Sequence, residues 1–286
     1  MFKRYSSREP VNHAVPISEL VGRAFRSAAL IPFLIIALLF AIGVPLAAVD
    51  DQAKQGEDFA IVIQGVISDR TDLFLGKAES VARLIGSGSD EVTTEERIDQ
   101  LVKLDPAIDS ALMTDVLGSL LVSVGDEVEK DVDVHAEAVS SVRETRSRYV
   151  SSPEFDEHLG EQAIVMAVPV LTPTEDLVGM LQIHVNTQWI LAAVKRTNAT
   201  LEVNTFVTDG EGNVVVHEEA WRVLAGQRLE SVESGLVSGL EGQRIIAGVV
   251  DVPEWGGEMR VVTTWPLSVV YVNVLLGMLP VLIILV

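Results

Sequence analysis

Two long segments without charged side chains lie on either side of a polar central region. Residues 28–49 form the first segment and residues 267–286 the second, with lengths of 22 and 20 residues. About 20 helical residues, at about 1.5 Å each, cross the hydrocarbon core of a bilayer. The pattern therefore predicts two transmembrane helices, with residues 50–266 between them.

Each predicted span has an alternative. The first could be the core of a cleavable signal peptide, because Ala47 and Ala48 resemble a cleavage site, although the apolar run is longer than a usual signal core. The second could be a buried core helix, but Trp265 and Tyr271 near its start are typical anchors at a membrane interface. Because the apolar run continues to the last residue, we expect the second span to be truncated.

The pattern after the first span is helical. Between residues 50 and 85, apolar residues recur at steps of three and four and predict one long helix. They are Phe59, Ile63, Val66, Ile67, Leu73, Phe74, Val81 and Leu84. The Gly-Ser-Gly-Ser sequence at residues 86–89 ends this helix. Thr93 or Thr94 then caps a short second helix that ends at Leu104.

A short internal repeat relates residues 113–123 to residues 207–217. In each copy a Thr-Asp pair is followed by a glycine: Thr114, Asp115 and Gly118, then Thr208, Asp209 and Gly212. Asp tolerates turn geometry and Gly supplies positive φ, so each copy predicts a strand, a tight turn and a return strand. A second strand pair follows each copy, at residues 163–170 with 177–186 and at residues 244–252 with 258–264.

This order predicts an α+β fold. A long N-terminal helix precedes two tandem modules, each built on an antiparallel sheet, and two transmembrane helices flank the whole region. We expect a cytoplasmic segment (1–27), a first span (28–49), a long stalk helix with a short second helix (50–104), a membrane-distal module (105–187), a linking helix (188–204), a membrane-proximal module (205–266) and a second span (267–286).

Charge sets the expected orientation. Lys3, Arg4, Arg8, Arg23 and Arg26 precede the first span, and basic flanks favour the cytoplasmic side. Residues 50–266 therefore lie outside the cytoplasm. They hold 39 acidic and 16 basic residues, a formal net charge of −23, which disfavours nucleic acid as a partner. The chain has no cysteine, which excludes disulfides and thiolate chemistry.

The arrangement resembles the double Cache sensor domains of bacterial and archaeal receptors. The resemblance rests on the long helix after the first span and on five segments in this order: LVKLDPAIDSALMTDVLG (101–118), VPVLTP (168–173), LVGMLQIHV (177–185), TDGEGNVVVH (208–217) and WPL (265–267). It covers about residues 50–270.

The resemblance implies two PAS-like modules, of which the distal one binds a small ligand and the proximal one relays the signal. It implies a homodimer in the plasma membrane and no cofactor. It also implies a cytoplasmic output after the second span, such as a histidine kinase, a diguanylate cyclase or a chemoreceptor signalling region.

A basic and aromatic cluster, Arg143, Arg146, Arg148 and Tyr149, lies between the two strand pairs of the first module. The resemblance implies that this insertion and the facing strands, with Met166 and His184, wall the ligand pocket. Arginine suits a carboxylate ligand. The alternative is a solvated helix face that pairs with local acids such as Glu144 and Glu154. Amino-acid-binding members carry a Trp after the arginine and an acid on the strand; here that Trp is missing and His184 replaces the acid.

Other candidate chemistry is weaker. Asp131, Asp133 and His135 alternate and would share one face of a strand, where they could hold a metal, or they belong to a solvated acidic insertion. Asp209 and the residues after it resemble part of a calcium loop but lack its acidic spacing, so a hairpin turn explains them.

The sequence contains no catalytic motif. We therefore expect the non-enzymatic sensor region of a membrane receptor, which binds a small organic ligand such as a carboxylate. A ligand-free ectodomain that signals through a periplasmic protein partner, and a membrane-anchored enzyme, are the alternatives.

Overall fold

The computed structural model describes residues 17–88, 92–125, 134–156, 161–201, 203–255 and 259–276, except 270, 273 and 275. The chain divides into two units, Met1–Ala48 and Val49–Val286. The side chains of residues 28–42 and 45 of the first predicted span, and residues 270, 273, 275 and 277–286 of the second, lie outside the described part. Within the part that is described, no helix is long and apolar enough to cross a membrane.

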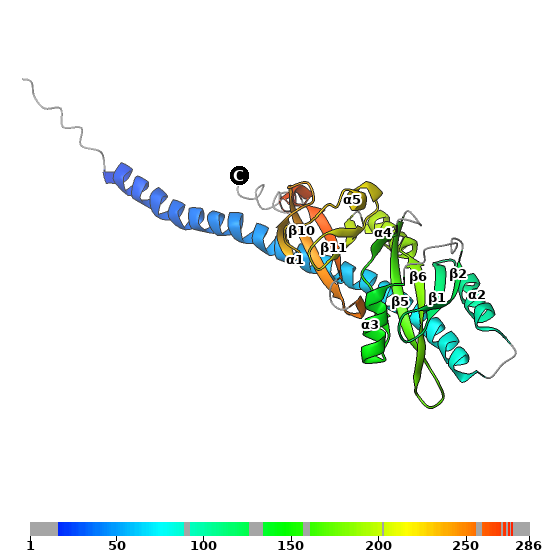
Figure 1. Ribbon diagram of the computed structural model, residues 1–286. Coiled ribbons are helices and arrows are strands. Elements are labelled where there is room, and N and C mark those ends of the chain that lie inside the picture. Colours follow the sequence, from blue (N-terminus) through cyan, green and yellow to red (C-terminus); the bar gives the residue numbers. More distant parts are fainter. Residues whose placement is uncertain are drawn as a thin grey trace, which may run out of the picture. The chain divides into compact units, whose positions relative to one another are not determined.

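The first helix, α1 (Ile17–Ser87), contains the whole helix predicted at residues 50–85 (Figure 1). Its last residue precedes Gly88, whose positive φ of 61° is typical of a helix C-terminus. From Ala53 onward one face of α1 is buried, mainly through Ala60, Ile63, Ile67, Phe74, Leu75, Ala78 and Ala82. Of the predicted apolar pattern, Ile63, Ile67 and Phe74 belong to this buried face, whereas Val66, Leu73 and Leu84 are exposed.

The short helix α2 (Thr94–Leu104) begins with a capping box. The hydroxyl of Thr93 accepts the backbone N–H of Glu96, and the Glu96 carboxylate accepts the backbone N–H of Thr93. Both bonds satisfy N–H groups that a helix start leaves without partners. The predicted cap is confirmed as Thr93.

A six-stranded antiparallel sheet follows α2. Its strand order is β2-β1-β6-β5-β3, and β4 also pairs with β5. The strands are β1 (Ile108–Thr114), β2 (Leu120–Gly125), β3 (Tyr149–Val150), β4 (Glu154–Asp156), β5 (Glu161–Leu171) and β6 (Leu177–Asn186), with α3 (Ala136–Thr145) inserted between β2 and β3. The hairpins predicted at residues 113–123 and 163–186 are confirmed.

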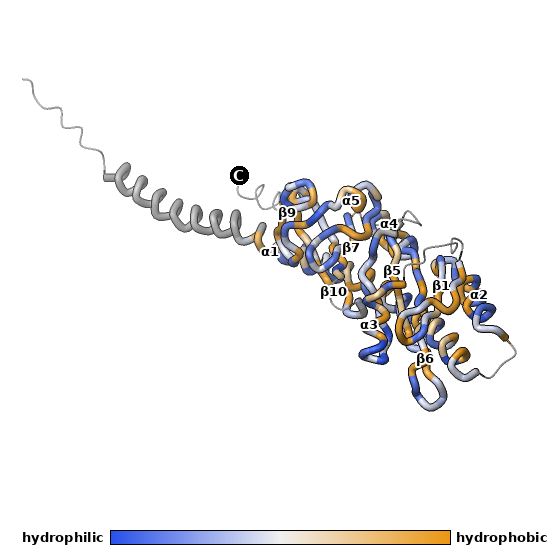
Figure 2. The backbone as a smooth tube through the Cα atoms, in the orientation of Figure 1, coloured by the Kyte–Doolittle hydropathy of each residue, from blue (hydrophilic) through white to orange (hydrophobic). Residues whose placement is uncertain are grey.

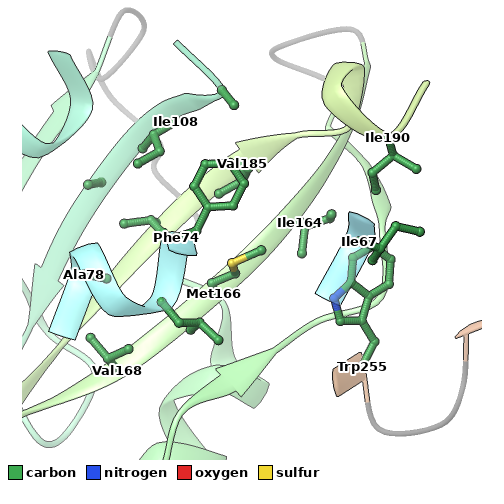
Figure 3. Close-up of a cluster of buried hydrophobic side chains, with 14 of the residues drawn as sticks. Ile67, Phe74, Ala78, Ile108, Ile164, Met166, Val168, Val185, Ile190 and Trp255 are labelled. Carbon is green, nitrogen blue, oxygen red and sulfur yellow. The ribbon is translucent and has the colours of Figure 1, made fainter. Parts of the chain in front are cut away.

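The two faces of this sheet are covered by different helices, because successive side chains of a strand point in opposite directions. On β5, Met166 and its even-numbered neighbours pack in the cluster that contains Phe74 of α1, and Figure 3 shows Phe74 between Val185 and Met166. Val165 and Ala167 pack instead against α3. The sheet is therefore a middle layer between α1 and α3.

Helix α4 (Gln188–Leu201) leads to a second, five-stranded antiparallel sheet with the order β8-β7-β11-β10-β9. Its strands are β7 (Asn204–Asp209), β8 (Val214–Val216), β9 (Gly235–Ser238), β10 (Arg244–Val252) and β11 (Met259–Pro266), with the short helix α5 (Ala220–Leu224) and the 3-10 turn η1 (Pro253–Trp255) between them. The predicted α+β fold, with a long helix and two antiparallel sheets, is confirmed.

One hydrophobic core joins α1 to both sheets. It includes Phe74 of α1, Met166 of the six-stranded sheet and Val261 of the five-stranded sheet. Within it the indole Nε1 of Trp255 lies 3.3 Å from the hydroxyl of Thr71, so that a buried polar contact also ties η1 to α1. Hydrophilic residues gather at the β5–β6 hairpin tip and at the end of α3 (Figure 2).

Of the two interpretations of Asp131, Asp133 and His135, the strand is wrong at His135. His135 is not part of a strand: it is the N-cap of α3, and its Nδ1 accepts the backbone N–H of Ala138. A side chain that caps a helix start satisfies an N–H that has no partner inside the helix. Asp131 and Asp133 lie outside the described residues.

Candidate functional site

A row of five side chains crosses the six-stranded sheet on the face that α3 covers. The strand register pairs Ser123 with Leu112, Leu112 with Gln182, Gln182 with Ala167 and Ala167 with Tyr149. Residues that pair directly point to the same face of a sheet. Because Ala167 packs with α3, the whole row lies on that face.

Gln182 is the unusual member of this row. It sits in the central strand β6 and is fully buried. Both polar atoms of its amide, Nε2 and Oε1, have no hydrogen-bond partner within the described part of the chain, and neither does the hydroxyl of Ser123, two strands away in the same row. A buried polar group without a partner costs about 1–3 kcal/mol. Native structures keep such groups where they serve a purpose.

The residue at the equivalent position of the second module has a purely structural role. Thr114 pairs with Met180 and Leu112 with Gln182, just as Thr208 pairs with Arg260 and Phe206 with Val262. Val262 is thus the counterpart of Gln182. It is fully buried in an apolar cluster with Phe206, so the repeat position needs no amide for folding.

The same comparison shows that the buried hydroxyl of Thr114 does not indicate a ligand site. Its hydroxyl is also buried without a partner, but so is that of Thr208, its counterpart in the repeat. A feature present in both copies belongs to the shared scaffold. Gln182 therefore distinguishes the first module, and Thr114 does not. Ser123 does not distinguish it either, because its counterpart His217 also has a buried polar atom, Nε2, without a partner in the described part of the chain.

Tyr149 is the last member of this row, and His184 lies beside it. His184 is half-buried on the same face as Gln182 and pairs with Val165 on one side and Ser110 on the other. The Tyr149 ring is half-buried, 5.8 Å from the His135 ring that caps α3. His184 and Tyr149, two of the site residues predicted from the sequence, therefore lie on the same face of the sheet as Gln182.

The three arginines of the predicted cluster lie elsewhere. All are exposed, at the C-terminal end of α3 and before β3. Arg146 adopts a left-handed conformation as the C-cap of α3, and its guanidinium donates to the carbonyl of Glu175 at 3.5 Å. Arg148 forms a 2.8 Å ion pair with Asp72 of α1. The partners that the structure describes for Arg146 and Arg148 are therefore Glu175 and Asp72, and not the local acids Glu144 and Glu154.

Met166 lies on the opposite face of the sheet. Its register partner is Ile183, one residue beyond Gln182, and its fully buried side chain belongs to the core beneath α1. The alternation of a strand separates it from Tyr149 and His184. We leave Met166 out of the proposed site for this reason.

The Asp209 loop is a hairpin turn, as expected. Its carboxylate accepts the backbone N–H groups of Glu211 and Asn213, at 2.9 and 2.8 Å, which uses the oxygens that a cation would need. Among the residues that the structure describes, no group of three His, Cys, Asp or Glu side chains is placed to hold a metal ion.

Sequence reasoning missed Gln182, although a signal was present. Strand β6 reads LVGMLQIHVN, and its only polar side chains before the last residue are Gln182 and His184, two positions apart. That spacing puts both on one face of a strand that is otherwise apolar. This pair of polar residues on one face of a central strand was the sequence signal for a site at Gln182.

Comparison of this structure with known structures finds sensory domains of receptors. The ligand-binding domain of the Pseudomonas aeruginosa amino acid chemoreceptor PctC, in complex with GABA, is 17% identical, with a TM-score of 0.58 over 76% of this chain and 98% of that one. The ligand-binding domain of the Pseudomonas fluorescens chemoreceptor CtaA, in complex with L-isoleucine, is 15% identical, with a TM-score of 0.60 over 79% and 95%.

An extracellular ligand-binding receptor from Desulfohalobium retbaense is 12% identical, with a TM-score of 0.56 over 74% of this chain. This chain spans only 40% of the length of that receptor. No family model matches the sequence, and no curated protein does. The fold is thus that of chemoreceptor ligand-binding sensory domains, as the resemblance to double Cache domains predicted.

Proposed function

We propose that the chain is the sensor region of a membrane receptor and that its distal module binds a small organic ligand over Gln182. The ligand lies between α3 and the six-stranded sheet. Ser123, Gln182, His184 and Tyr149 contact it. The region itself is not an enzyme, and it uses no cofactor.

The single observation that carries this proposal is the contrast between Gln182 and Val262. The two residues occupy equivalent positions in the two sheets, but Val262 completes an apolar core while the buried amide of Gln182 has no partner among the described residues. A bound molecule that hydrogen-bonds the amide would offset the cost of burying it. A ligand-free ectodomain would gain stability from an apolar residue at position 182.

The chemistry of the row sets the kind of ligand. An amide offers a donor and an acceptor, and a hydroxyl offers both, so the ligand carries both types of group. GABA and L-isoleucine, bound by the structural neighbours, are small molecules of this kind. A carboxylate remains the preferred candidate. Arg146 and Arg148 do not contact the ligand in this proposal, because both are exposed and engaged with Glu175 and Asp72.

The charge pattern supports the membrane placement. In this proposal residues 28–49 and 267–286 cross the plasma membrane, the basic N-terminus is cytoplasmic and residues 50–266 are extracytoplasmic. Ligand binding favours one arrangement of the two modules, and the spans pass this on to a cytoplasmic output such as a histidine kinase.

The exposed side of α1 supports a homodimer. Val62, Val66, Leu73 and Leu84 are all between 43% and 62% exposed. Spacings of 4, 7 and 11 residues bring them to one side of a helix, opposite the face that packs in the core. A second copy of α1 would cover this apolar stripe.

The test is a thermal-unfolding screen of the full chain in detergent against amino acids, small carboxylates, amines and amides. A ligand at 100 times its Kd stabilises the folded state by about 2.7 kcal/mol. In Gln182→Leu, the ligand-free protein should be more stable by about 1–2 kcal/mol, because a buried polar group without a partner is gone, and the response to ligand should be lost.

Thr208→Val is the matched control. It removes an equally buried hydroxyl from the other module, so it should keep the full response to ligand. A ligand response that survives in Gln182→Leu would refute the site. Silence across the whole screen would favour the alternative in which a periplasmic protein is the partner.

A further inference from the structure

A pocket of about 260 Å³ opens at the junction of the two modules. One wall comes from the start of β5 and from the linking helix, with Gln162 and Leu191 among its residues. The other wall comes from β8 and α5 of the second module, including Val215 and Val223. None of the lining residues belongs to the row around Gln182, so the pocket is separate from the site proposed above.

The pocket lies between two hydrophobic clusters. Leu191 of α4 and Val215 of β8 pack against the central core that joins α1 to both sheets. Val223 of α5 packs against the separate cluster around Phe206. Atoms that face a gap lack the contacts that a close-packed interior provides. A molecule in the pocket would restore these contacts on both sides and so join the two clusters.

The polar side chains of the lining offer a ligand little to bind. His217 is 5% exposed; its Nδ1 accepts the backbone N–H of Glu219 at 2.9 Å, and its Nε2 is buried. Oε1 of Gln162 is buried as well, and the hydroxyl of Thr187 donates to the Gln162 carbonyl at 3.2 Å. Gln188 is exposed and can meet one neutral polar group of a ligand. The rest of the surface that a ligand would touch is largely apolar.

Charge and volume restrict the ligand further. Among the described residues that line the pocket, none is Asp, Glu, Lys or Arg. An ion placed there would lose hydration without a counter-charge, which is costly. Apolar cavities of about 150 Å³ bind benzene. A pocket of about 260 Å³ therefore accommodates a single ring with a small substituent.

Helix α5, which forms part of the second wall, has little to hold it in place. It is five residues long, none of these residues is buried, and its N-cap Glu219 makes no side-chain hydrogen bond to the helix start. Arg222 anchors it through a 2.7 Å ion pair with Glu241 and a 2.9 Å hydrogen bond to Gln227. Elements with few buried apolar contacts open at low cost in free energy. We therefore expect α5 to yield to an entering ligand and to become more ordered once it packs on one.

We propose that this pocket binds a small uncharged ligand with an apolar ring, such as a cyclic alcohol, which joins the two hydrophobic clusters through Leu191, Val215 and Val223. The proposal goes beyond the distal site and does not depend on it. In the receptor proposed above, this ligand tightens the packing between the linking helix and the proximal module. It is therefore a second input, located after the distal module.

The test compares three ring compounds of different charge on the full chain in detergent: cyclohexanol, cyclohexylamine and cyclohexanecarboxylate, each up to about 20 mM. In thermal unfolding, cyclohexanol should give a saturable stabilisation and the two ions none. Hydrogen exchange of residues 218–226 should slow when cyclohexanol is bound, because α5 becomes ordered. All variants are measured in the same micelles, so partitioning of the probe into detergent cancels in the comparison.

Two variants fill the pocket. Val223→Phe and Ala220→Leu each add apolar volume where the ligand would lie, so each should weaken binding of cyclohexanol at least about tenfold. If Val223→Phe does not fold, Ala220→Leu decides, because Ala220 is exposed and its replacement disturbs no core contact. Leu236→Phe is the matched control: it adds volume at a 42% exposed position on β9, outside the lining, and should bind normally.

The proposal is overturned if cyclohexanol gives no saturable stabilisation by about 20 mM, or if both filling variants keep the full response. A response that is lost in Gln182→Leu but kept in the filling variants would assign the probe to the distal site. Equal stabilisation by cyclohexanecarboxylate would overturn the requirement for an uncharged ligand.

Discussion

Gly56 of α1 and Gly248 of β10 pack backbone against backbone where the long helix crosses the five-stranded sheet. A Cβ on Gly56 would lie 2.7 Å from Cζ3 of Trp265 and 3.0 Å from the Cα of Gly248. Only glycine on both sides allows this approach, because real Cβ atoms do not come so close to other atoms. The contact fixes where the helix meets the proximal module.

Gly248→Ala should lower the free energy of unfolding by about 1–3 kcal/mol, because the new methyl group overlaps the backbone of Gly56 and forces the helix away. Urea unfolding of the full chain measures the change. Gly65→Ala is the control: a Cβ there meets nothing within 4 Å, so it should stabilise α1 by about 0.5–1 kcal/mol. Equal effects of the two variants would show that the crossing is not tight.

Asp105 should make stability depend on pH. Burial raises the pKa of its carboxyl, but hydrogen bonds from Lys77 and Ala107 and the charges of Arg70 and Lys77 together lower it. Lys77 Nζ lies at 2.7 Å and Arg70 Nη2 at 3.2 Å. A depressed pKa contributes stability that is present above the unfolded value of about 3.9 and is lost as pH falls through the folded value.

Asp105→Asn should therefore cost about 1–3 kcal/mol at pH 7 and progressively less as the pH falls from about 4 toward 2.5. Urea unfolding of both proteins between pH 7 and pH 2.5 measures this. Asp99→Asn is the control, because its 2.7 Å pair with Lys103 is exposed on α2 and should change stability little at any pH. A difference in unfolding free energy between Asp105→Asn and the parent protein that stays constant over this pH range would contradict the prediction.

The ligand response should distinguish Tyr149 from Arg148. Tyr149→Ala removes a half-buried ring beside Gln182 and should abolish stabilisation by the distal ligand. Arg148→Ala breaks an ion pair with Asp72 whose side chains are 52% and 55% exposed, so it should cost under about 1 kcal/mol and leave the response intact. If Arg148→Ala abolished the response and Tyr149→Ala did not, the arginines would belong to the ligand site.

The apolar stripe of α1 should control oligomeric state. Leu73→Glu places a charge in the middle of the stripe, and we expect the dimer to dissociate at least tenfold more readily, measured by analytical ultracentrifugation of the full chain in detergent. Leu104→Glu is the matched control, since Leu104 is 73% exposed at the end of α2, away from the stripe. A monomeric parent protein would refute the proposed dimer itself.

Local signals in the sequence were enough to predict most elements. The capping residue Thr93, the turns that begin at Asp115 and Asp209, and the apolar runs of β5 and β6 each depend on residues close together in the chain. Such features are governed by backbone chemistry that neighbours determine. This is why the long helix, the hairpins and the tandem order followed from the sequence.

The candidate site depended on contacts that the sequence does not display. Arg148 pairs with Asp72, 76 positions earlier, and not with the neighbouring acids. Met166 and Tyr149 fall on opposite faces because Tyr149 of β3 pairs with Ala167 of β5, while Val150 pairs with Met166. A shift of one residue in strand register exchanges the faces, and pairing between distant strands sets that register. The role of Gln182 became visible only by comparison with Val262.

The contact between Trp255 and Thr71 has a consequence for the order of folding. The two residues are 184 positions apart, and the core around Thr71 also needs Met259 and Val261 of the last strand. Long-range contacts of this kind form slowly, because a large loop must close before they contribute. The part of α1 around Thr71 thus emerges early during synthesis and is covered last. A nascent chain halted before residue 255 would expose this part of the helix, which makes it the segment that a chaperone would bind.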